Sequence, residues 1–333
     1  PYRYKWNTCD TTRNISALAV GTYTLTATDA NGCTQSVTTT LTQPPKINYS
    51  VKSVKDVSCN GEAEGSIDIV VSGGLGPYTY KWNSGATTQD LLGVKAGVYN
   101  VQITDANGCI NTLDATIKEP QTLTLAIDTV MNILCHGDRK GSVNITVAGG
   151  VAPYSYTWSN GATTQDIGQL PAGNYSVTVF DSKGCSKSAS MVVTEPPALE
   201  AKLIGVNNIA CFGDKAGAVT IEVAGGVKPY AFKWSNGATT QNISGVAAGT
   251  YTVDISDKNG CTQKITATIN QPPKLVVASG QGKNISCFNG TDGAVNVTVT
   301  GGMAPFTYKW SNGATTQDLA NVGAGAYSLL VVD

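Results

Sequence analysis

Cysteine is the residue type best placed to do chemistry in this chain, because eight of its nine cysteines recur at a fixed spacing. Two series, each with a 76-residue period, comprise Cys33, Cys109, Cys185 and Cys261, and Cys59, Cys135, Cys211 and Cys287. Thiols can form disulfides or bind a metal ion. The chain has no Cys-x-x-Cys pair and a single histidine, His136. We therefore predict disulfides, with no metal site and no cofactor.

The spacing leaves two pairing schemes open. Bonds within a repeat would be Cys59–Cys109, Cys135–Cys185 and Cys211–Cys261. Bonds across a junction would instead be Cys33–Cys59 and Cys109–Cys135. The second scheme makes two strands, each about 30 Å long, fold back on each other before the sulfurs can meet. The first requires only that both cysteines share one end of the domain, and it is the pairing we predict. Cys9 has no partner in either scheme.

Tryptophan follows the same period, at Trp6, Trp82, Trp158, Trp234 and Trp310. A fixed period with fixed landmarks indicates one structural unit copied in tandem. Proline-bearing junctions give a partial repeat at 1–44, complete repeats at 45–120, 121–196 and 197–272, and a partial repeat at 273–333. We expect the sequence to be an internal stretch of a longer array. No Ser/His/Asp, Cys/His or paired-carboxylate arrangement recurs, so we predict that the protein is not an enzyme.

The elements that position these residues are predicted to be strands. In repeat 45–120, alternating or β-branched stretches separated by Gly, Pro and Asn turns lie at 47–54, 66–71, 78–82, 86–94, 98–104 and 109–117. No helical period of useful length is present. The pattern predicts an all-β fold, a tandem array of small Ig-like β-sandwich domains similar to PKD or fibronectin type III domains, joined like beads on a string. The order Cys, Trp, Cys fits an Ig-like domain, but the Tyr-x-Cys corner of a true Ig domain is absent.

Two recurring groups are candidate binding residues. Tyr78, Tyr80 and Trp82 share one face of a strand, where they could stack on sugars or fill a core. The core interpretation is favoured, and it makes Trp82, Trp158, Trp234 and Trp310 structural. Asp105, Asp181 and Asp257 begin Asp-x-x-Gly turns. One carboxylate per repeat is too few for a calcium site, so we expect these residues to cap turn amides.

Composition narrows the class of protein. The net charge of −1 gives no electrostatic attraction for nucleic acid. No apolar run approaches the roughly 18 residues of a membrane-spanning segment. Charged residues make up only 14% of the chain. This composition favours an extracellular β-protein, in which disulfides would stabilise small domains.

Four strings carry a family resemblance: Pro-Tyr-x-Tyr-x-Trp, Ser-Asn-Gly-Ala-Thr-Thr-Gln-Asp, Ala-Gly-x-Tyr-x-Val and Asp-x-Asn-Gly-Cys. They resemble the SprB-type repeat of gliding-motility adhesins in the Bacteroidota, over the whole chain. The first repeat departs at 7–10, where Cys9 occupies the glycine position of the turn.

The resemblance implies a large cell-surface filament, attached at the outer membrane, exported by the type 9 secretion system and moved by the gliding machinery. The implied partners are neighbouring repeats, that machinery, and extracellular polysaccharide or a solid surface. The leading interpretation is a structural stalk of a secreted adhesin. The alternative is an array of polysaccharide-binding modules that acts through avidity.

Overall fold

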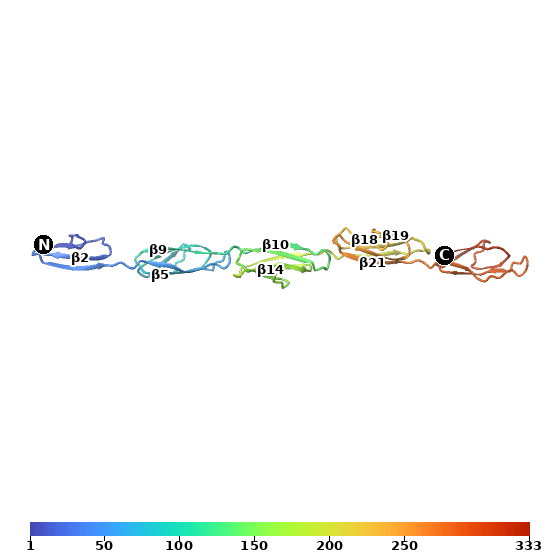
Figure 1. Cartoon of the computed structure of the whole chain (residues 1–333), viewed down its shortest axis with the longest axis horizontal. Helices are drawn as coiled ribbons and strands as arrows, with labels where there is room; N and C mark the ends of the chain where they lie inside the picture. The colour runs from blue at the N-terminus through green and yellow to red at the C-terminus, as the bar shows by residue number, and fades with distance from the viewer. The chain divides into compact units, whose positions relative to one another are not determined.

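The computed structural model describes residues 1–333, and every regular element in it is a β-strand (Figure 1). The structure contains no helix that is long and apolar enough to cross a membrane. The chain forms two compact units. Unit 1 comprises residues 1–126, 146–165 and 177–189, and unit 2 comprises residues 127–145, 166–176 and 190–333. The all-β class predicted from the sequence is therefore confirmed.

Unit 1 contains the partial first repeat and one complete repeat. Residues 1–44 form a single sheet of β1 (Arg3–Trp6), β2 (Gly21–Thr28) and β3 (Thr34–Leu41). Residues 45–120 form one sheet of β4 (Asn48–Lys55), β5 (Gly65–Ser72) and β7 (Leu91–Val94), and a second sheet of β6 (Thr79–Trp82), β8 (Gly97–Thr104) and β9 (Ile110–Ile117). All of the strand pairs within these sheets are antiparallel.

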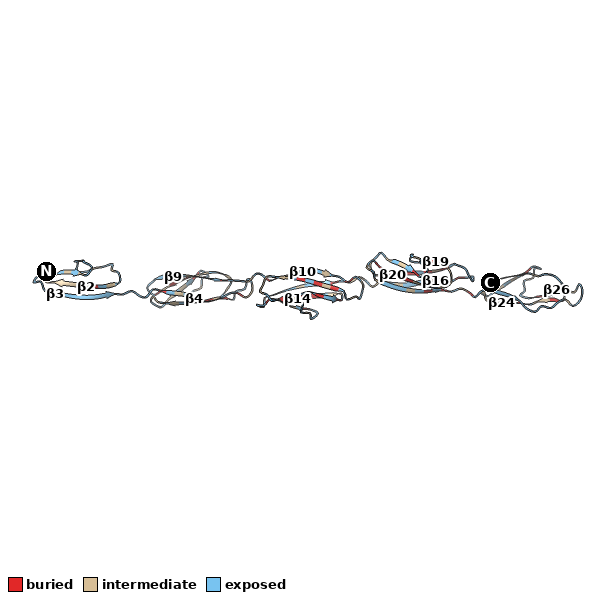
Figure 2. Cartoon of the chain, viewed as in Figure 1, coloured by how far each residue is buried: buried red, intermediate tan, exposed pale blue.

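The middle repeat contributes residues to both units and has the same two sheets. One sheet contains β10 (Thr124–Met131), β11 (Gly141–Ala148) and β13 (Ile167–Leu170), and the other contains β12 (Ser155–Trp158), β14 (Gly173–Phe180) and β15 (Ser186–Val193). Buried and more exposed residues alternate along β14, as Figure 2 shows by colour. This alternation follows from the two-residue period of a strand with one face against a core.

The rest of unit 2 holds the last complete repeat and the partial one. Residues 197–272 form sheets of β16 (Glu200–Asn207), β17 (Gly217–Ala224) and β19 (Ile243–Val246), and of β18 (Ala231–Trp234), β20 (Gly249–Ser256) and β21 (Thr262–Ile269). Residues 273–333 form three two-stranded sheets: β22 (Val276–Ser279) with β24 (Val297–Thr300), β23 (Gly293–Val295) with β26 (Leu319–Val322), and β25 (Thr307–Trp310) with β27 (Leu329–Val332).

The core of repeat 45–120 lies between its two sheets. Ile67 and Ile69 of β5 and Val101 and Ile103 of β8 are fully buried in one cluster. Trp82 belongs to the same cluster and is 2% exposed. Two sheets that share one core form a β-sandwich, as the sequence predicts. An equivalent cluster surrounds Trp234 in repeat 197–272.

Each buried tryptophan also has its polar atom satisfied. Trp82 Nε1 donates a hydrogen bond of 2.8 Å to the carbonyl oxygen of Thr88. The same bond, also of 2.8 Å, joins Trp158 to Thr164, Trp234 to Thr240, and Trp310 to Thr316. The segment after the tryptophan therefore wraps over the indole ring. This wrapping explains why the strand predicted at 86–94 is confined to Leu91–Val94.

Side chains from this wrapped segment replace a missing strand partner for Ile69. Asp90 Oδ1 accepts a hydrogen bond of 3.0 Å from Ile69 N. Gln89 Nε2 donates one of 2.7 Å to Ile69 O. Both backbone groups of a buried residue are thereby satisfied, which a buried strand requires. The Gln-Asp or Gln-Asn pair recurs in the later repeats for the same reason: Gln241 and Asn242 bond to Ile221, and Gln317 and Asp318 bond to Val297.

The first repeat keeps its turn despite the substitution at Cys9. Cys9 N donates a 3.0 Å hydrogen bond to Trp6 O, as Gly85 N does to Trp82 O. Cys9 has φ of 74°, against 89° for Gly85. The turn therefore forms with cysteine in the left-handed region, at a cost of about 1–2 kcal/mol relative to glycine.

We predict that Trp82→Ala destabilises repeat 45–120 by about 3–5 kcal/mol, because it leaves a cavity between two sheets. Hydrogen–deuterium exchange of peptides from β5 and β8 measures this loss in one repeat. Leu92→Ala is the matched control, because Leu92 is 73% exposed and its loss should change stability by less than about 0.5 kcal/mol. Unchanged exchange in Trp82→Ala would contradict the core role of the tryptophan.

Candidate functional site

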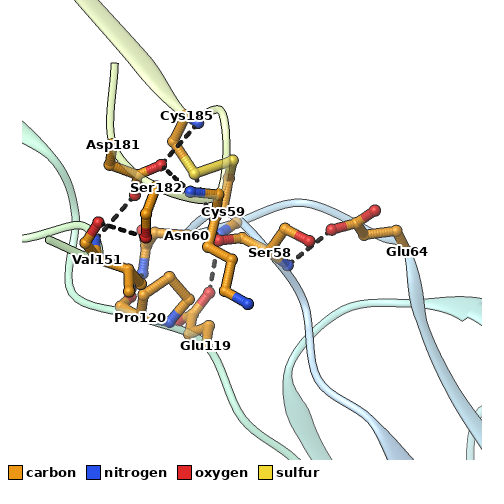
Figure 3. The surroundings of a disulfide bond; sticks show 12 residues. Ser58, Cys59, Asn60, Glu64, Glu119, Pro120, Val151, Asp181, Ser182 and Cys185 are labelled. Carbon is orange, nitrogen blue, oxygen red and sulfur yellow. Dashed lines mark hydrogen bonds between the residues drawn. A yellow bond between two sulfur atoms is a disulfide. The ribbon is translucent and has the colours of Figure 1, made fainter. Parts of the chain in front are cut away.

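Two disulfides join successive repeats. Cys59 is bonded to Cys185 within unit 1, and Cys135 to Cys261 within unit 2. The S–S distances are 2.05 and 2.07 Å, and each bond spans 126 positions of sequence. Each bond links the loop between the first two strands of one repeat to a hairpin of the next repeat (Figure 3). We call these segments the cysteine loop (58–64, 134–140, 210–216 and 286–292) and the aspartate hairpin (29–33, 105–109, 181–185 and 257–261).

The predicted pairing within a repeat is wrong. The scheme comprised Cys59–Cys109, Cys135–Cys185 and Cys211–Cys261, and none of these bonds is present. The junction alternative, with Cys33–Cys59 and Cys109–Cys135, is absent as well. Cys9, Cys33, Cys109, Cys211 and Cys287 are free and exposed.

Repeat 45–120 shows why its own two cysteines cannot meet. Val57 N bonds to Lys118 O over 3.1 Å, which places the cysteine loop beside the last residues of the repeat. Ala106 N bonds to Leu75 O over 2.8 Å, and the neighbouring Gly74 N bonds to Pro45 O over 2.6 Å. The aspartate hairpin therefore lies beside the first residues of the repeat. The loop and the hairpin occupy opposite ends of one sandwich, too far apart for a disulfide.

The cysteine loop is held by the residue before the junction proline. Glu119 Oε2 accepts a 2.8 Å hydrogen bond from Gly61 N. Glu195 accepts the equivalent bond from Gly137 over 2.7 Å, and Gln271 accepts it from Gly213 over 3.0 Å. An acceptor 58 positions after the loop glycine thus recurs in three repeats, and it ties the loop to the junction.

The residue after the loop cysteine reaches across the junction. Asn60 Nδ2 donates to Pro120 O over 3.1 Å, and Asn60 Oδ1 accepts from Thr122 Oγ1 over 2.9 Å. His136 occupies the same position in the next repeat, where its Nδ1 lies 3.3 Å from Pro196 O and 3.3 Å from a Glu195 oxygen. The contacts of His136 with Pro196 and Glu195 place it in the junction.

The aspartate hairpin is organised by one carboxylate. Asp105 Oδ1 accepts hydrogen bonds from Cys109 N at 2.8 Å and from Asn107 N at 2.9 Å, and Oδ2 accepts one from Leu75 N at 3.2 Å. The backbone hydrogen bond from Cys109 is the main cause that lowers the pKa of Asp105. Asp105 is only 6% exposed, and Asp181 and Asp257 make the same contacts.

The carboxylate of Asp105 also explains why glycine occupies position 74, which faces it. Gly74 has φ of +60°, and a Cβ atom there would lie 2.9 Å from Asp105 Oδ2. Both carboxylate oxygens already serve backbone amides, as expected for a turn cap. No group of three or more His, Cys, Asp or Glu side chains is placed to hold a metal ion. The junction itself contains a disulfide and a hydrogen bond between repeats.

The lowered pKa of Asp105 predicts acid sensitivity. The folded state gains stability from this ionised carboxylate above its ordinary pKa of about 4, and loses it as the pH falls through the lower folded value. We expect Asp105→Asn to destabilise repeat 45–120 at neutral pH and to reduce its loss of stability in acid. Hydrogen exchange of β8 and β9 across this range is the measurement. Glu62→Gln, at an exposed residue of the cysteine loop, should leave both quantities unchanged.

Two solved structures are among those similar to this chain. The chain is similar to the N-terminal eight Ig domains of Down Syndrome Cell Adhesion Molecule, with 11% identity over 99% of this chain and 68% of that chain and a TM-score of 0.31. It is also similar to three N-terminal domains of the outer capsid protein Hoc of bacteriophage RB49, with 15% identity over 67% of this chain and 96% of that chain and a TM-score of 0.33. No curated protein matches the sequence.

The match to a sequence family is periodic, like the chain itself. The SprB repeat matches residues 51–87, 127–163, 205–239 and 279–315. Each match runs from the first strand of a repeat through the cysteine loop to the turn after the tryptophan, and the aspartate hairpins lie outside the matched segments. The chain thus carries four matches to the SprB repeat, consistent with a SprB-type repeat region.

Proposed function

We propose that this chain is part of the structural stalk of a large secreted adhesin that a cell uses for gliding motility and surface attachment. The SprB repeats suggest a structural repeat stalk of a surface protein, and the finer role follows from the family resemblance. In this proposal the working units are the repeats 45–120, 121–196 and 197–272, with partial repeats at 1–44 and 273–333. Their partners are neighbouring repeats, the secretion and gliding machinery, and an external polysaccharide or solid surface.

The disulfides support a place outside the cytoplasm. Disulfides persist in oxidising compartments and at cell surfaces, and they are rare where thiols are kept reduced. The two bonds here close loops of 126 positions each, and such crosslinks stabilise a small domain by restricting its unfolded state. A cell-surface filament, attached at the outer membrane and exported by a type 9 system, would lie in an environment where disulfides persist.

The observation that carries the proposal is that the two disulfide loops overlap. The first encloses residues 59–185 and the second encloses 135–261, so residues 135–185 lie inside both. A tension applied to the chain therefore has a short covalent route. It passes from Cys59 through the first bond to Cys185, back along the chain to Cys135, and through the second bond to Cys261. This route contains 50 positions of backbone, whereas the direct route from Cys59 to Cys261 contains 202.

A stalk under load benefits from such a route. Forced unfolding of a domain is governed by its unfolding rate, and a domain that does unfold normally releases its whole length. Here the released length is limited even if every sheet between Cys59 and Cys261 separates. This arrangement suits a protein that transmits force along its chain. The tryptophans do not support the alternative of polysaccharide binding, because Trp82, Trp158, Trp234 and Trp310 are all buried.

Single-molecule pulling from the two ends of the chain tests the proposal. At about 3.5 Å per residue, the stretch from Cys59 to Cys261 should extend to roughly 175 Å when oxidised and roughly 700 Å when reduced. A variant with Cys59→Ser and Cys185→Ser keeps only the second bond, so its shortest route contains 76 positions and should extend to roughly 270 Å.

These three contour lengths distinguish the overlapping pairing from other disulfide pairings. The variant is the matched control, because it removes one bond and leaves the fold of each sandwich intact. Equal contour lengths with and without reductant would exclude the overlapping loops and remove the main support for a load-bearing stalk.

A further inference from the structure

A cavity borders each of the two disulfides. The first cavity, in unit 1, has a volume of about 400 Å³ and is lined by Cys59 and Cys185 together with side chains of both repeats that the bond joins. The second cavity, in unit 2, has about 350 Å³ and is lined by Cys135 and Cys261. Both volumes fall within the roughly 300–1,000 Å³ of small-molecule sites, so a small molecule can lie against either bond.

The bonded cysteines are accessible from these cavities. All four of them are only partly buried. Reduction of a disulfide requires that an attacking thiolate reach one of its sulfur atoms. Each cavity supplies that access without unfolding of the sandwich on either side.

The two cavities differ in one charged residue. Glu62 lines the first cavity, and Asp138, 76 positions later, lines the second. Lys187 lines the first cavity as well, whereas the residue 76 positions after it is the neutral Gln263. The first cavity therefore has both an acidic and a basic side chain, and the basic one has no counterpart in the second junction.

The two charges of the first cavity have no partner within the chain. Glu62 and Lys187 are exposed, and neither forms an ion pair. In the second cavity, by contrast, Asp138 is paired with Lys140 over 3.1 Å. A ligand that carries both a carboxylate and an ammonium group would therefore find two free counter-charges only at the first cavity.

The disulfide beside these charges indicates the third group of the ligand. A thiolate is the group that reacts with a disulfide. A molecule with a thiol, a carboxylate and an ammonium group is a thiol amino acid or a thiol peptide, and free cysteine is a small example. We propose that the first cavity binds such a thiol, with its carboxylate at Lys187 and its ammonium group at Glu62, and that the bound thiolate cleaves the Cys59–Cys185 bond. The inference does not rest on the proposed function.

The reaction consumes two molecules of the free thiol. The first thiolate attacks one sulfur of the protein bond and forms a mixed disulfide with it, and the other protein sulfur leaves as a thiolate that takes up a proton. The second thiolate attacks the bound thiol's sulfur, which releases the second protein thiolate. Two free cysteine molecules and one protein disulfide thus give one cystine and two protein thiols.

Cleavage of the first bond alone changes the covalent route along the chain. The second bond, Cys135–Cys261, stays closed. The shortest route from Cys59 to Cys261 then lengthens from 50 positions to 76, which is the separation of Cys59 and Cys135. Thiol amino acids would therefore release the chain in a fixed order, with the first bond before the second.

The experiment compares free cysteine with cysteamine, which has the same thiol and ammonium group but no carboxylate. The oxidised whole chain is incubated with each thiol, free thiols are blocked at intervals, and the remaining Cys59–Cys185 and Cys135–Cys261 peptides are quantified by mass spectrometry. Each bond gives a ratio of the rate constant with cysteine to that with cysteamine. We expect this ratio to be about two- to fivefold higher at the first bond than at the second, the range that an exposed ion pair supplies.

Three variants assign this difference to the cavity. Lys187→Gln introduces the residue type found at position 263, and it should lower the ratio at the first bond to that at the second. Lys183→Gln is the matched control, because Lys183 is an exposed residue of the same hairpin that does not line the cavity. Glu62→Gln should slow both thiols at the first bond and leave their ratio unchanged, because both carry the ammonium group.

Hydrogen exchange of β14 and β15 before the thiol is added shows that each variant is folded. Equal ratios at the two bonds would overturn the proposal, and so would an unchanged ratio in Lys187→Gln or an equal fall in Lys183→Gln. Unchanged rates in Glu62→Gln, or a first bond that neither thiol reduces, would also overturn it. None of these outcomes alters the contour lengths expected for the fully oxidised and fully reduced chains, so the two proposals can fail separately.

Discussion

One tryptophan between two three-stranded sheets holds each complete repeat together. A small sheet alone buries too little apolar surface to be stable, and the indole supplies the largest single contact across the core. The segment that follows Trp82 is shaped by this burial: it bends at Gly85, covers the ring, and delivers Gln89 and Asp90 to the backbone of Ile69. In residues 1–44 only one sheet is present, and Trp6 is correspondingly only half-buried.

The aspartate of the hairpin fixes the end of repeat 45–120 that lies near the first residues of the repeat. Asp105 fixes its own turn and also the turn at Leu75, so two segments 30 positions apart share one carboxylate. Because this network is complete within a repeat, the hairpin cysteine is presented in a fixed direction. The junction contacts of Gly61 with Glu119 do the same for the loop cysteine. The disulfide then joins two groups that the fold has already placed.

Much of the fold could be predicted from the sequence because its signals are local. Alternation placed five of the six strands of repeat 45–120 within two residues, and the aromatic spacing indicated the core. The segment 86–94 was misjudged because side chains take the place of a strand there, and no periodicity reveals that substitution. The turn at Cys9 keeps its shape with a φ of 74°, and Trp6 Nε1 still donates a hydrogen bond to the carbonyl oxygen of Thr12.

The disulfide pairing could not be predicted because it depends on which end of the sandwich each cysteine occupies. Strand lengths constrain that choice poorly, since loop and hairpin are separated by four strands. A usable signal existed in the acceptor that recurs 58 positions after the loop glycine, at Glu119, Glu195 and Gln271. It ties the loop to the start of the next repeat, which leaves that repeat's hairpin as the nearest thiol.

The overlap of the two disulfide loops also bears on proteolysis. Every peptide bond between Cys59 and Cys261 lies inside at least one loop. A protease that cuts once in an exposed turn, for example beside Lys95 or Lys183, therefore leaves a single covalent molecule. In a chain without the bonds, the same cut would shed everything beyond it. Repeats crosslinked in this staggered way can be nicked in the environment and still remain attached.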